Sequence, residues 1–369
     1  MKSTRGRLVH VASLEAFDRR TAAGAHALSG WRLRGLDLRE RSDVLARCRL
    51  TGATFLGCTF AEGDSERAEA QGALVLPAIP DVPVDPYRDR LYSPGELYDT
   101  ADYAASVDAR AYAWAQQAEG PEALLAQALH DHAIDGALEE ALAGWRRGRR
   151  VVGVMGGHAH RRGDAAYADA ARLGQALGVT HVVATGGGPG AMEAANLGAW
   201  LSGGDGDLEQ ALARLGEVPS YRPSIGAWAR AALDVRERFP DGAESLGIPT
   251  WHYGHEPPNV FASAIAKYFR NATREAILLE VCDGGIVFLP GAAGTVQEIF
   301  QDACENYYAD ESAVAPMVLV GREHWTGTVP AWPLLRSLAR ERLMEDHVHL
   351  VDTVEEAAAL LVPEEVSRS

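Results

Sequence analysis

The sequence is poor in cysteine and in long apolar runs, and each scarcity excludes a class of protein. Its 369 residues include only four cysteines, none of them in a CxxC pair. Neither a zinc ribbon nor a disulfide framework is therefore expected. No run of 18 apolar residues occurs, which argues against a membrane-spanning helix. The first residues lack the apolar core of a signal peptide, so we expect a cytoplasmic protein with reduced thiols.

Basic residues are also scarce relative to acidic ones. The chain has 35 Lys and Arg against 51 Asp and Glu, for a formal net charge of -16. Proteins that coat nucleic acids gain affinity by neutralising phosphates with basic side chains, so neither a nucleic acid nor a membrane surface is the expected partner. An acidic protein can still bind a small phosphorylated molecule through backbone N–H groups at a helix N-terminus.

Residues 1–76 differ from the rest of the chain and contain a five-residue period. Two interleaved series follow it within residues 48–62: Leu50, Phe55 and Phe60, and Cys48, Ala53 and Cys58. This period resembles pentapeptide repeats, which coil into a square β-helix. The alternative is a chance pattern in a small β-rich segment. In both cases we expect these residues to serve packing rather than chemistry.

Residues 77–148 are predicted to connect this segment to a larger domain. Five prolines in residues 77–95 indicate an extended connector. From about residue 95 the apolar residues recur at helical spacing. His130 and His132 lie in the second of the predicted helices, where we expect packing or solvent-facing roles.

Residues 149–362 alternate between apolar strands and helices. This alternation predicts a parallel sheet with helices on both faces, which binds ligands beyond the carboxyl ends of its strands. The pattern predicts a short strand over 248–254 and one long helix over 259–281. An insertion, 203–248, contains a predicted helix and is either surface elaboration, a lid or an oligomer contact.

Two glycine-rich loops follow strands and open helices within this domain. They read TGGGPGAME over 185–193 and PGAAGTVQE over 290–298. The helix behind each loop supplies free N–H groups and the positive end of its dipole, which together attract an anion. Neither loop has the GxGxxG or GxxxxGK[ST] spacing, so a standard dinucleotide fold and a P-loop NTPase are disfavoured.

These loops resemble the LONELY GUY (LOG) family, whose hallmark is PGGxGTxxE preceded by a helix that carries a catalytic arginine. This chain has PGAAGTVQE, with Arg274 in the preceding helix, and the resemblance covers roughly residues 150–320. It implies a Rossmann-like, doubly wound α/β fold without metal or organic cofactor, and a homodimer or larger homo-oligomer. The implied activity is hydrolysis of nucleoside 5′-monophosphates to free base and ribose 5-phosphate. The alternative is a carrier or sensor of the same fold that binds nucleotides without cleaving them.

The resemblance assigns roles to particular residues. Glu298 is the expected catalytic carboxylate and Arg274 the residue that orients and stabilises the substrate, while Gly291, Gly294 and Thr295 are expected to hold the 5′-phosphate. The predicted nucleotide cleft consists of Gly156, Gly157, Gly186, Gly187, Gly188, Gly190, Met192, Glu193, His255 and Asn259.

Two positions depart from the family pattern. Ala292 replaces a glycine of the hallmark, which narrows the room for a close backbone approach. Glu275 stands where the family often has lysine, so a negative charge replaces a positive one near the expected phosphate.

Other interpretations of the same residues need no ligand. Thr295 and Glu298 have the spacing of a capping box. At helical spacing, Arg274 belongs to a basic stripe with Lys267 and Arg270, which would be a solvated face. The stretch WHYGHEPPN is either a ligand contact or a structural turn. Asp283 and Asp302 are expected to be surface or capping residues.

Overall fold

The computed structural model describes residues 8–146, 148–204, 207–252 and 256–362. Its contacts divide the chain into two compact units. The first unit comprises residues 8–87 and 119–129, and the second comprises residues 88–118 and those from 130 onward. Across these described ranges, none of the helices combines the length and apolar character needed to cross a membrane.

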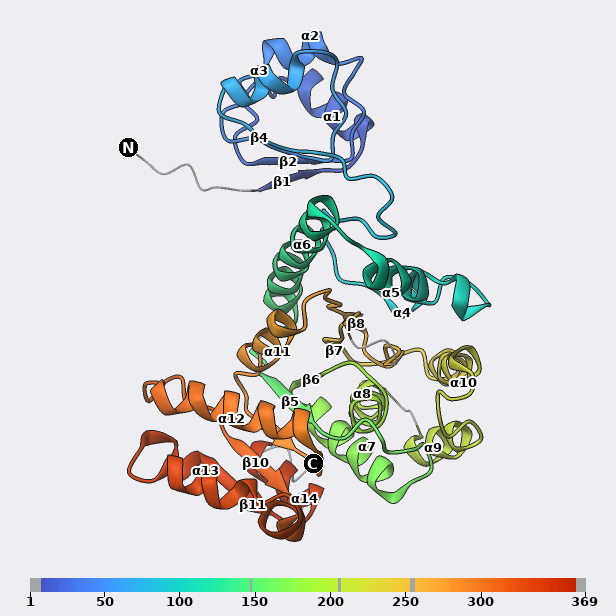
Figure 1. The fold of residues 1–369 in the computed structure, drawn as a ribbon, viewed down its shortest axis with the longest axis vertical. Helices are drawn as coiled ribbons and strands as arrows, with labels where there is room; N and C mark the ends of the chain where they lie inside the picture. Colours follow the sequence, from blue (N-terminus) through green and yellow to red (C-terminus); the bar gives the residue numbers. More distant parts are fainter. Residues whose placement is uncertain (1–7, 147, 205–206, 253–255, 363–369) are drawn as a thin grey trace. The chain divides into compact units, whose positions relative to one another are not determined.

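The first unit is a parallel sheet with intervening helices. Its strands lie in the order β1-β2-β3-β4, and Figure 1 shows its helices on one side of that sheet. The strands are β1 (Val9–Val11), β2 (Trp31–Arg34), β3 (Thr54–Leu56) and β4 (Leu74–Leu76). The helices are α1 (Leu14–Ala22), α2 (Ser42–Arg47) and α3 (Asp64–Ala70).

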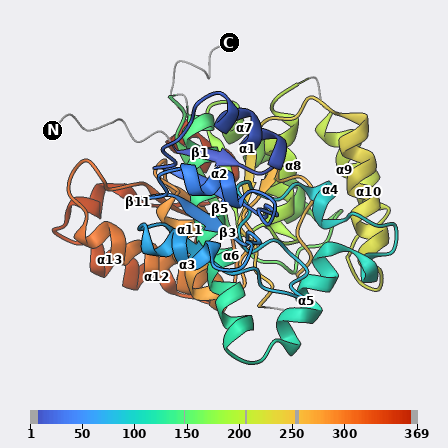
Figure 2. The same cartoon turned by 90° about the horizontal axis from the view of Figure 1, so that it is seen from above.

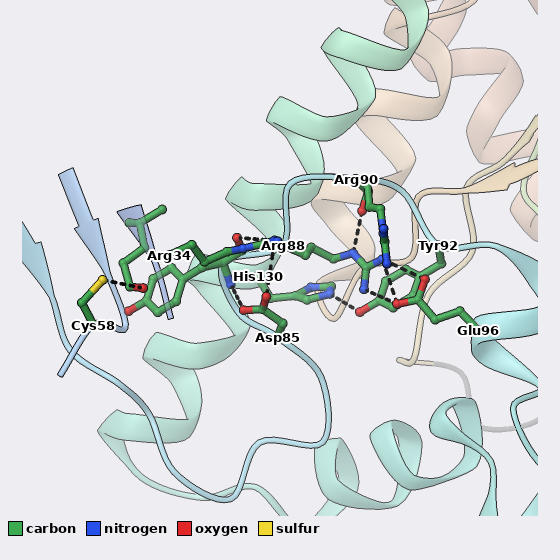
Figure 3. Close-up of polar contacts among 10 residues, drawn as sticks. Arg34, Cys58, Asp85, Arg88, Arg90, Tyr92, Glu96 and His130 are labelled. Carbon is green, nitrogen blue, oxygen red and sulfur yellow. Dashed lines mark hydrogen bonds and ion pairs between the residues drawn. The ribbon is translucent and has the colours of Figure 1, made fainter. Parts of the chain in front are cut away.

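The residues of the five-residue period pack in the core of this unit. Parallel pairing aligns Leu33 of β2 with Phe55 of β3, 22 positions later. Leu28, Leu33, Leu50 and Phe55 are fully buried, and the Cys58 thiol donates to the Leu33 carbonyl at 3.4 Å (Figure 3). The packing role predicted for the period is confirmed. The helices were not predicted, because each full coil spans 20 to 22 residues and places a helix between successive strands, which a five-residue window does not reveal.

The second unit contains the Rossmann-like parallel sheet that the sequence predicts. Among the described residues its seven strands lie in the order β11-β10-β9-β5-β6-β7-β8. From β5 the chain first builds outward to β8 and then returns to β9 on the other side. The order therefore reverses between β5 and β9, the place where such sheets bind ligands. The strands are β5 (Val151–Met155), β6 (Val182–Thr185), β7 (Ser245–Gly247), β8 (Ala264–Ile265), β9 (Ile286–Phe288), β10 (Met317–Val320) and β11 (Val348–Val351).

Helices cover this sheet, and α7 and α8 are side by side in Figure 1 and in contact. Every residue of α8 is buried, as expected for a helix enclosed between a sheet and a neighbouring helix. The helices of the sheet domain are α7 (Ala165–Gly178), α8 (Ala191–Leu201), α11 (Asn271–Glu280), α12 (Ala293–Tyr308), α13 (Ala331–Ala339) and α14 (Val354–Leu361), with shorter turns at η2 (His324–Thr328) and η3 (Leu343–His347).

The connector contributes buried side chains to the second unit. His130 is fully buried and lies 2.8 Å from the Tyr92 hydroxyl, whereas His132 is exposed. Figure 3 shows the Arg88 guanidinium between Glu96 and the ring of Tyr92. The packing role predicted for His130 is confirmed. The connector elements are α4 (Pro94–Leu97), η1 (Tyr103–Ala105), α5 (Val107–Gln117) and α6 (Pro121–Arg146).

The prediction of one long helix over 259–281 is wrong. Only α11 is helical there, and the residues before it form β8, which pairs with β7 in parallel. A further bridge joins Thr250 to Tyr268. Nearly every side chain of 259–269 is buried, so pairing with the sheet edge outweighs the helical spacing of the apolar residues. The short strand predicted over 248–254 is also wrong for its described part, because β7 ends at Gly247 and residues 248–252 pair with the sheet only at Thr250. Residues 253 and 254 lie outside the described residues.

Because the residues before α11 are not helical, the predicted basic stripe of Lys267, Arg270 and Arg274 does not form. Lys267 precedes α11 and is fully buried, with its Nζ 2.6 Å from Asp108 Oδ1. Asp108 also accepts from Trp251 Nε1 at 2.8 Å and from the Tyr103 hydroxyl at 2.9 Å. Lys267 is thus part of an internal network and shares no face with Arg274.

The insertion is helical, as predicted, and it does more than decorate the surface. Its helices α9 (Leu208–Gly216) and α10 (Ile225–Arg238) lie side by side in Figures 1 and 2 and contact each other. Trp228 of α10 is fully buried in the core cluster beside α7 and α8. Surface elaboration alone does not explain a core residue of this size.

Candidate functional site

Three loops meet at the carboxyl ends of β5, β6 and β9. The Ala191 N–H, which opens α8, donates to the Gly157 carbonyl after β5 at 3.2 Å. A Cβ placed on Gly157 would lie 3.4 Å from the carbonyl oxygen of Pro290, after β9. The two predicted glycine-rich loops therefore both contact the loop after β5, at the point where strand order reverses.

Buried hydrogen bonds hold the loop after β6 in place. The Gly187 N–H donates to the Thr185 hydroxyl at 3.0 Å. Asn259 is fully buried, and its Nδ2 donates to the Gly188 carbonyl and to Asn196 Oδ1 at 3.2 and 3.0 Å. Its Oδ1 accepts the backbone N–H groups two and three positions further along the chain. The Asn259 amide is fully used within the protein, so this residue supports the loop from beneath.

Gly190 and Met192 shape the exit of the same loop. Gly190 has φ of 72°, which favours glycine, and a Cβ there would lie 2.7 Å from the Gly157 carbonyl oxygen. Met192 is nearly buried, and its side chain packs against Gly186 and Gly188. Tight backbone contact therefore brings this loop against the one after β5.

The third loop, after β9, leads into helix α12. The structure contradicts the capping box predicted at the start of this helix. The helix begins at Ala293 after the N-cap residue Ala292, and no side chain caps it. Thr295 thus lies within the first turn, where its hydroxyl cannot serve as the cap, and Glu298 lies one turn further on. The N–H groups of the first helical turn have no partner in the helix itself.

The predicted phosphate residues surround this helix N-terminus. A Cβ on Gly291 would overlap the Thr295 hydroxyl, so glycine is required there. Gly294 faces open space. Ala292 has a negative φ of -122°, so this position lies outside the left-handed region that favours glycine. The alanine that departs from the family pattern therefore does not occupy a positive-φ position.

Glu298 and Arg274 lie together beside this N-terminus. Arg274 Nη1 is 3.9 Å from Glu298 Oε1, and the two side chains are 9% and 17% exposed. Burial raises the pKa of Glu298 to about 7, although Arg274 opposes this shift. The nearby carboxylates of Glu275 and Glu256 raise it further. A carboxyl group with this pKa exchanges its proton near neutral pH.

Arg274 also connects α11 to the loop after β6. A Cβ on Gly186 would lie 3.6 Å from Arg274 Nη2. The guanidinium Nε is buried and has no hydrogen-bond partner among the described residues. Such an unpaired buried donor is costly, and it makes Arg274 the side chain best placed to bind an acceptor in this site.

Glu275, the second departure from the family pattern, bridges two helices. Its carboxylate accepts from Asn271 Nδ2 and from Gln297 Nε2, both at 2.6 Å. The charge is therefore fixed between α11 and α12, close enough to Glu298 to raise its pKa.

Glu193 is a buried residue of the predicted cleft and is engaged by another side chain of the protein. It is 1% exposed and forms a two-pronged ion pair with Arg162, with Arg162 Nε 3.0 Å from Glu193 Oε2. Gly156 packs against Leu289 and Ala191. His255 lies outside the described residues.

Sequence reasoning missed the histidines after β5, and it considered Glu256 only as one possible contact to the base or ribose within WHYGHEPPN. His158 Nδ1 lies 3.5 Å from Glu256 Oε1, and a Cβ on Gly188 would lie 3.5 Å from Glu256 Oε2. His160 Nε2 would lie 3.6 Å from a Cβ on Gly157. The signal was available, because HAHRRG begins two glycines after the strand Val151–Met155, at the sheet edge where ligands bind.

Asp302 corrects a further prediction. It is 6% exposed rather than a surface residue, and its Oδ2 has no hydrogen-bond partner within the part of the chain that the structure describes. Burial raises its pKa to about 8, with a smaller contribution from Glu305. Asp283, by contrast, is exposed, as the surface alternative predicted, and its carboxylate accepts the Val151 N–H at 2.9 Å at the start of β5.

No protein-family model and no curated protein sequence matches the chain. Among solved structures, the chain resembles a molybdenum cofactor binding protein from Rippkaea orientalis, with 17% identity and a TM-score of 0.36 over 57% of this chain and 94% of that one. It also resembles the molybdenum cofactor carrier protein of Chlamydomonas reinhardtii, with 17% identity and a TM-score of 0.35 over 57% and 95% of the two chains. Similarities this weak do not bear on what the chain binds.

Proposed function

We propose that this protein is a LOG-type phosphoribohydrolase that cleaves the N-glycosidic bond of nucleoside 5′-monophosphates. The observation that carries the proposal is the position of the Glu298 carboxyl group. It faces Arg274 beside an uncapped helix N-terminus, at the reversal of strand order. The reaction needs a carboxyl group, a cation and a phosphate-binding site around one substrate, and Glu298, Arg274 and the N-terminus of α12 would supply them.

The 5′-phosphate would bind at the first turn of α12. The N–H groups of Ala293, Gly294 and Thr295 precede the first intrahelical donor, and the helix dipole adds positive potential there. Gly294 faces open space, so a phosphate oxygen can approach the backbone. The protein's net charge of -16 does not prevent phosphate binding, because salt screens distant surface charges whereas the N–H contacts act at short range.

Glu298 would act at the anomeric carbon. Breaking the C1′–N bond builds positive charge on the ribose, which a carboxylate stabilises. Water then adds to C1′ and loses a proton, and the departing base takes up a proton. A pKa of about 7 lets Glu298 be partly ionised at neutral pH, so it can accept the proton of that water.

Arg274 would orient the ribose or the base. Its buried guanidinium lies between Glu298 and the loop after β6 and still has a donor to offer. A guanidinium is planar and always charged, so it fixes geometry more strictly than a lysine would.

The direct test is release of ribose 5-phosphate from the purified chain, measured over purine, pyrimidine and cytokinin monophosphates. We expect turnover of at least one class, and loss of that turnover in Glu298→Gln. Tight binding of a monophosphate without product from any substrate would instead favour the carrier or sensor alternative.

The resemblance to the LOG family also leads us to propose a homodimer or larger homo-oligomer. Light scattering of the purified chain tests this, and a monomeric mass at micromolar concentration would contradict it.

A further inference from the structure

A cavity of about 340 Å³ lies where the loop after β5 meets the insertion. Side chains from both segments line it, among them His158, His160, Arg161, Tyr221, Arg222 and Trp228. Glu298 and Arg274 do not line it. It is therefore distinct from the catalytic pair, although Gly190 and Glu193 of the nucleotide cleft form part of its wall.

The ion pair of Arg162 and Glu193 lines the floor of this cavity. Arg162 engages both carboxylate oxygens of Glu193, and both side chains are 1% exposed. Arg162 Nη1 also donates to the Trp228 carbonyl at 3.0 Å, and its guanidinium lies 4.6 Å from the centre of the Trp228 ring. The pair is committed to structure, so Glu193 adds no net negative charge to the cavity.

The remaining charged lining residues are basic. The side chains of Arg161 and Arg222 are exposed and form no ion pair within the described ranges. His158 and His160 lie on the same wall, and His158 Nδ1 lies 3.5 Å from Glu256 Oε1. In a protein with a net charge of -16, a cavity with two unneutralised arginines is a local site of positive potential.

Aromatic rings complete the wall that the insertion contributes. Tyr221 and Trp228 meet edge to face, with ring centres 6.3 Å apart. A flat ligand ring would find apolar contact here and hydrogen-bond donors beside it, a combination typical of small-molecule sites. The burial of Trp228 in the core anchors this wall.

We propose that this cavity is a second anion subsite, which takes a phosphate group next to the proposed nucleotide site. The phosphate is either a second one on the bound nucleotide or belongs to a separate small anion. Arg161 and Arg222 supply the charge, and the insertion supplies the wall. Contact between the loops through Gly157 and Gly190 places the subsite beside the nucleotide cleft.

Calorimetric titration of the full chain tests this proposal, with Glu298→Gln as the background so that no substrate is consumed. The probes are adenosine 5′-monophosphate, adenosine 3′,5′-bisphosphate and inorganic pyrophosphate. Arg161→Ala and Arg222→Ala are each expected to weaken bisphosphate or pyrophosphate binding by roughly 10-fold to 100-fold, as for a lost charge-assisted hydrogen bond. The affinity for the monophosphate should change less than about twofold, because its single phosphate would bind only at the first turn of α12.

Arg214→Ala is the matched control. It removes one positive charge from the same insertion, but Arg214 is paired with Glu217 on the surface and does not line the cavity. If pyrophosphate competes with the monophosphate, the second phosphate belongs to the nucleotide; if both bind together, the subsite takes a separate anion.

Two results would overturn the subsite. One is failure of bisphosphate and pyrophosphate to bind the chain, and the other is unchanged affinity in the Arg161→Ala/Arg222→Ala double variant. Because binding is measured without turnover, absence of nucleosidase activity in the wild-type chain would refute the proposed function and leave this test intact.

Discussion

Arg274 Nη1 and Glu298 Oε1 are 3.9 Å apart, close enough to interact strongly but too far for a hydrogen bond. Both side chains are mostly buried, and burial raises the Glu298 pKa despite the neighbouring guanidinium. A structural ion pair would be closed by direct hydrogen bonds, as Arg162 and Glu193 are. The open geometry leaves both groups available to a third partner.

Replacing Glu298 by Gln should abolish most activity without unfolding the protein. If the carboxylate acts at C1′, kcat should fall by roughly 100-fold to 10,000-fold, the range for a lost acid–base group. Thermal unfolding should be unchanged or shifted upward, because the variant no longer has to bury an ionised carboxylate. Glu305→Gln, an exposed change on the same helix, is the control. Full activity in Glu298→Gln would remove the catalytic assignment.

Arg274→Ala should lower kcat/KM and raise the pKa of Glu298. We expect kcat/KM to fall by roughly 10-fold to 1,000-fold, because a buried charged donor is lost. The acid limb of the pH–rate profile should move to higher pH, since Arg274 holds the Glu298 pKa down. Arg274→Lys should restore part of that pH shift through its charge, and exposed Arg270→Ala should match the wild-type chain. A pH profile that is identical in Arg274→Ala would contradict the coupling.

Glu275→Gln should shift the activity profile in the opposite direction. Removing this charge takes away one cause of the raised Glu298 pKa, so the carboxylate ionises at lower pH. The amide can still accept from Asn271 or Gln297, so the link between α11 and α12 is largely preserved. kcat/KM measured between pH 5 and 8 should show an acid limb moved downward. An unmoved limb would mean that another group controls it.

Asp302→Asn should change how stability depends on pH. In the unfolded chain this carboxyl group ionises near pH 4, whereas in the fold it keeps its proton to about pH 8. The folded state therefore binds more protons in that window, and the free energy of unfolding falls as pH rises through it. Asn does not titrate, so the free energy of unfolding of the variant does not fall in this way. As pH rises, the difference between the variant's free energy of unfolding and that of the wild type should grow by at most about 1.4 kcal/mol per pH unit. Urea unfolding at pH 5 and pH 8 measures the difference, and a constant difference would show that Asp302 titrates normally.

Lys267→Met should destabilise the second unit strongly. Removing the cation leaves Asp108 buried without its counter-charge, a change that costs about 3–5 kcal/mol in other buried pairs. Lys267→Met/Asp108→Asn should recover part of this loss, because the amide carries no charge and its oxygen still accepts from Trp251. Denaturant unfolding of both variants tests this; a double variant no more stable than the single one would show that charge is not the cause.

Local patterns predicted the alternation of strands and helices, the two glycine-rich loops and the helical insertion. Strands Val151–Met155 and Met317–Val320 are short apolar runs buried on both faces, and such runs predict parallel strands from sequence alone. Glycines directly after strands similarly predict tight turns at the ligand-binding edge. In both cases the signal lies within a few neighbouring residues.

The segment before α11 shows where local patterns fail. Its apolar spacing is helical, yet hydrogen bonds from β7 and a bridge from Thr250 make part of it a strand. The pairing partners lie far enough away in sequence that no local window includes them.

By itself the sequence determined the sheet, its loops and the residue types at its edge, because backbone geometry and apolar spacing are local properties. The tertiary structure alone decided which charges are buried. It paired Lys267 with Asp108, buried the Asp302 carboxyl group and began α12 early enough to release Glu298 from a cap. Burial and charge pairing depend on side chains from distant elements, and those elements meet only when the chain has folded.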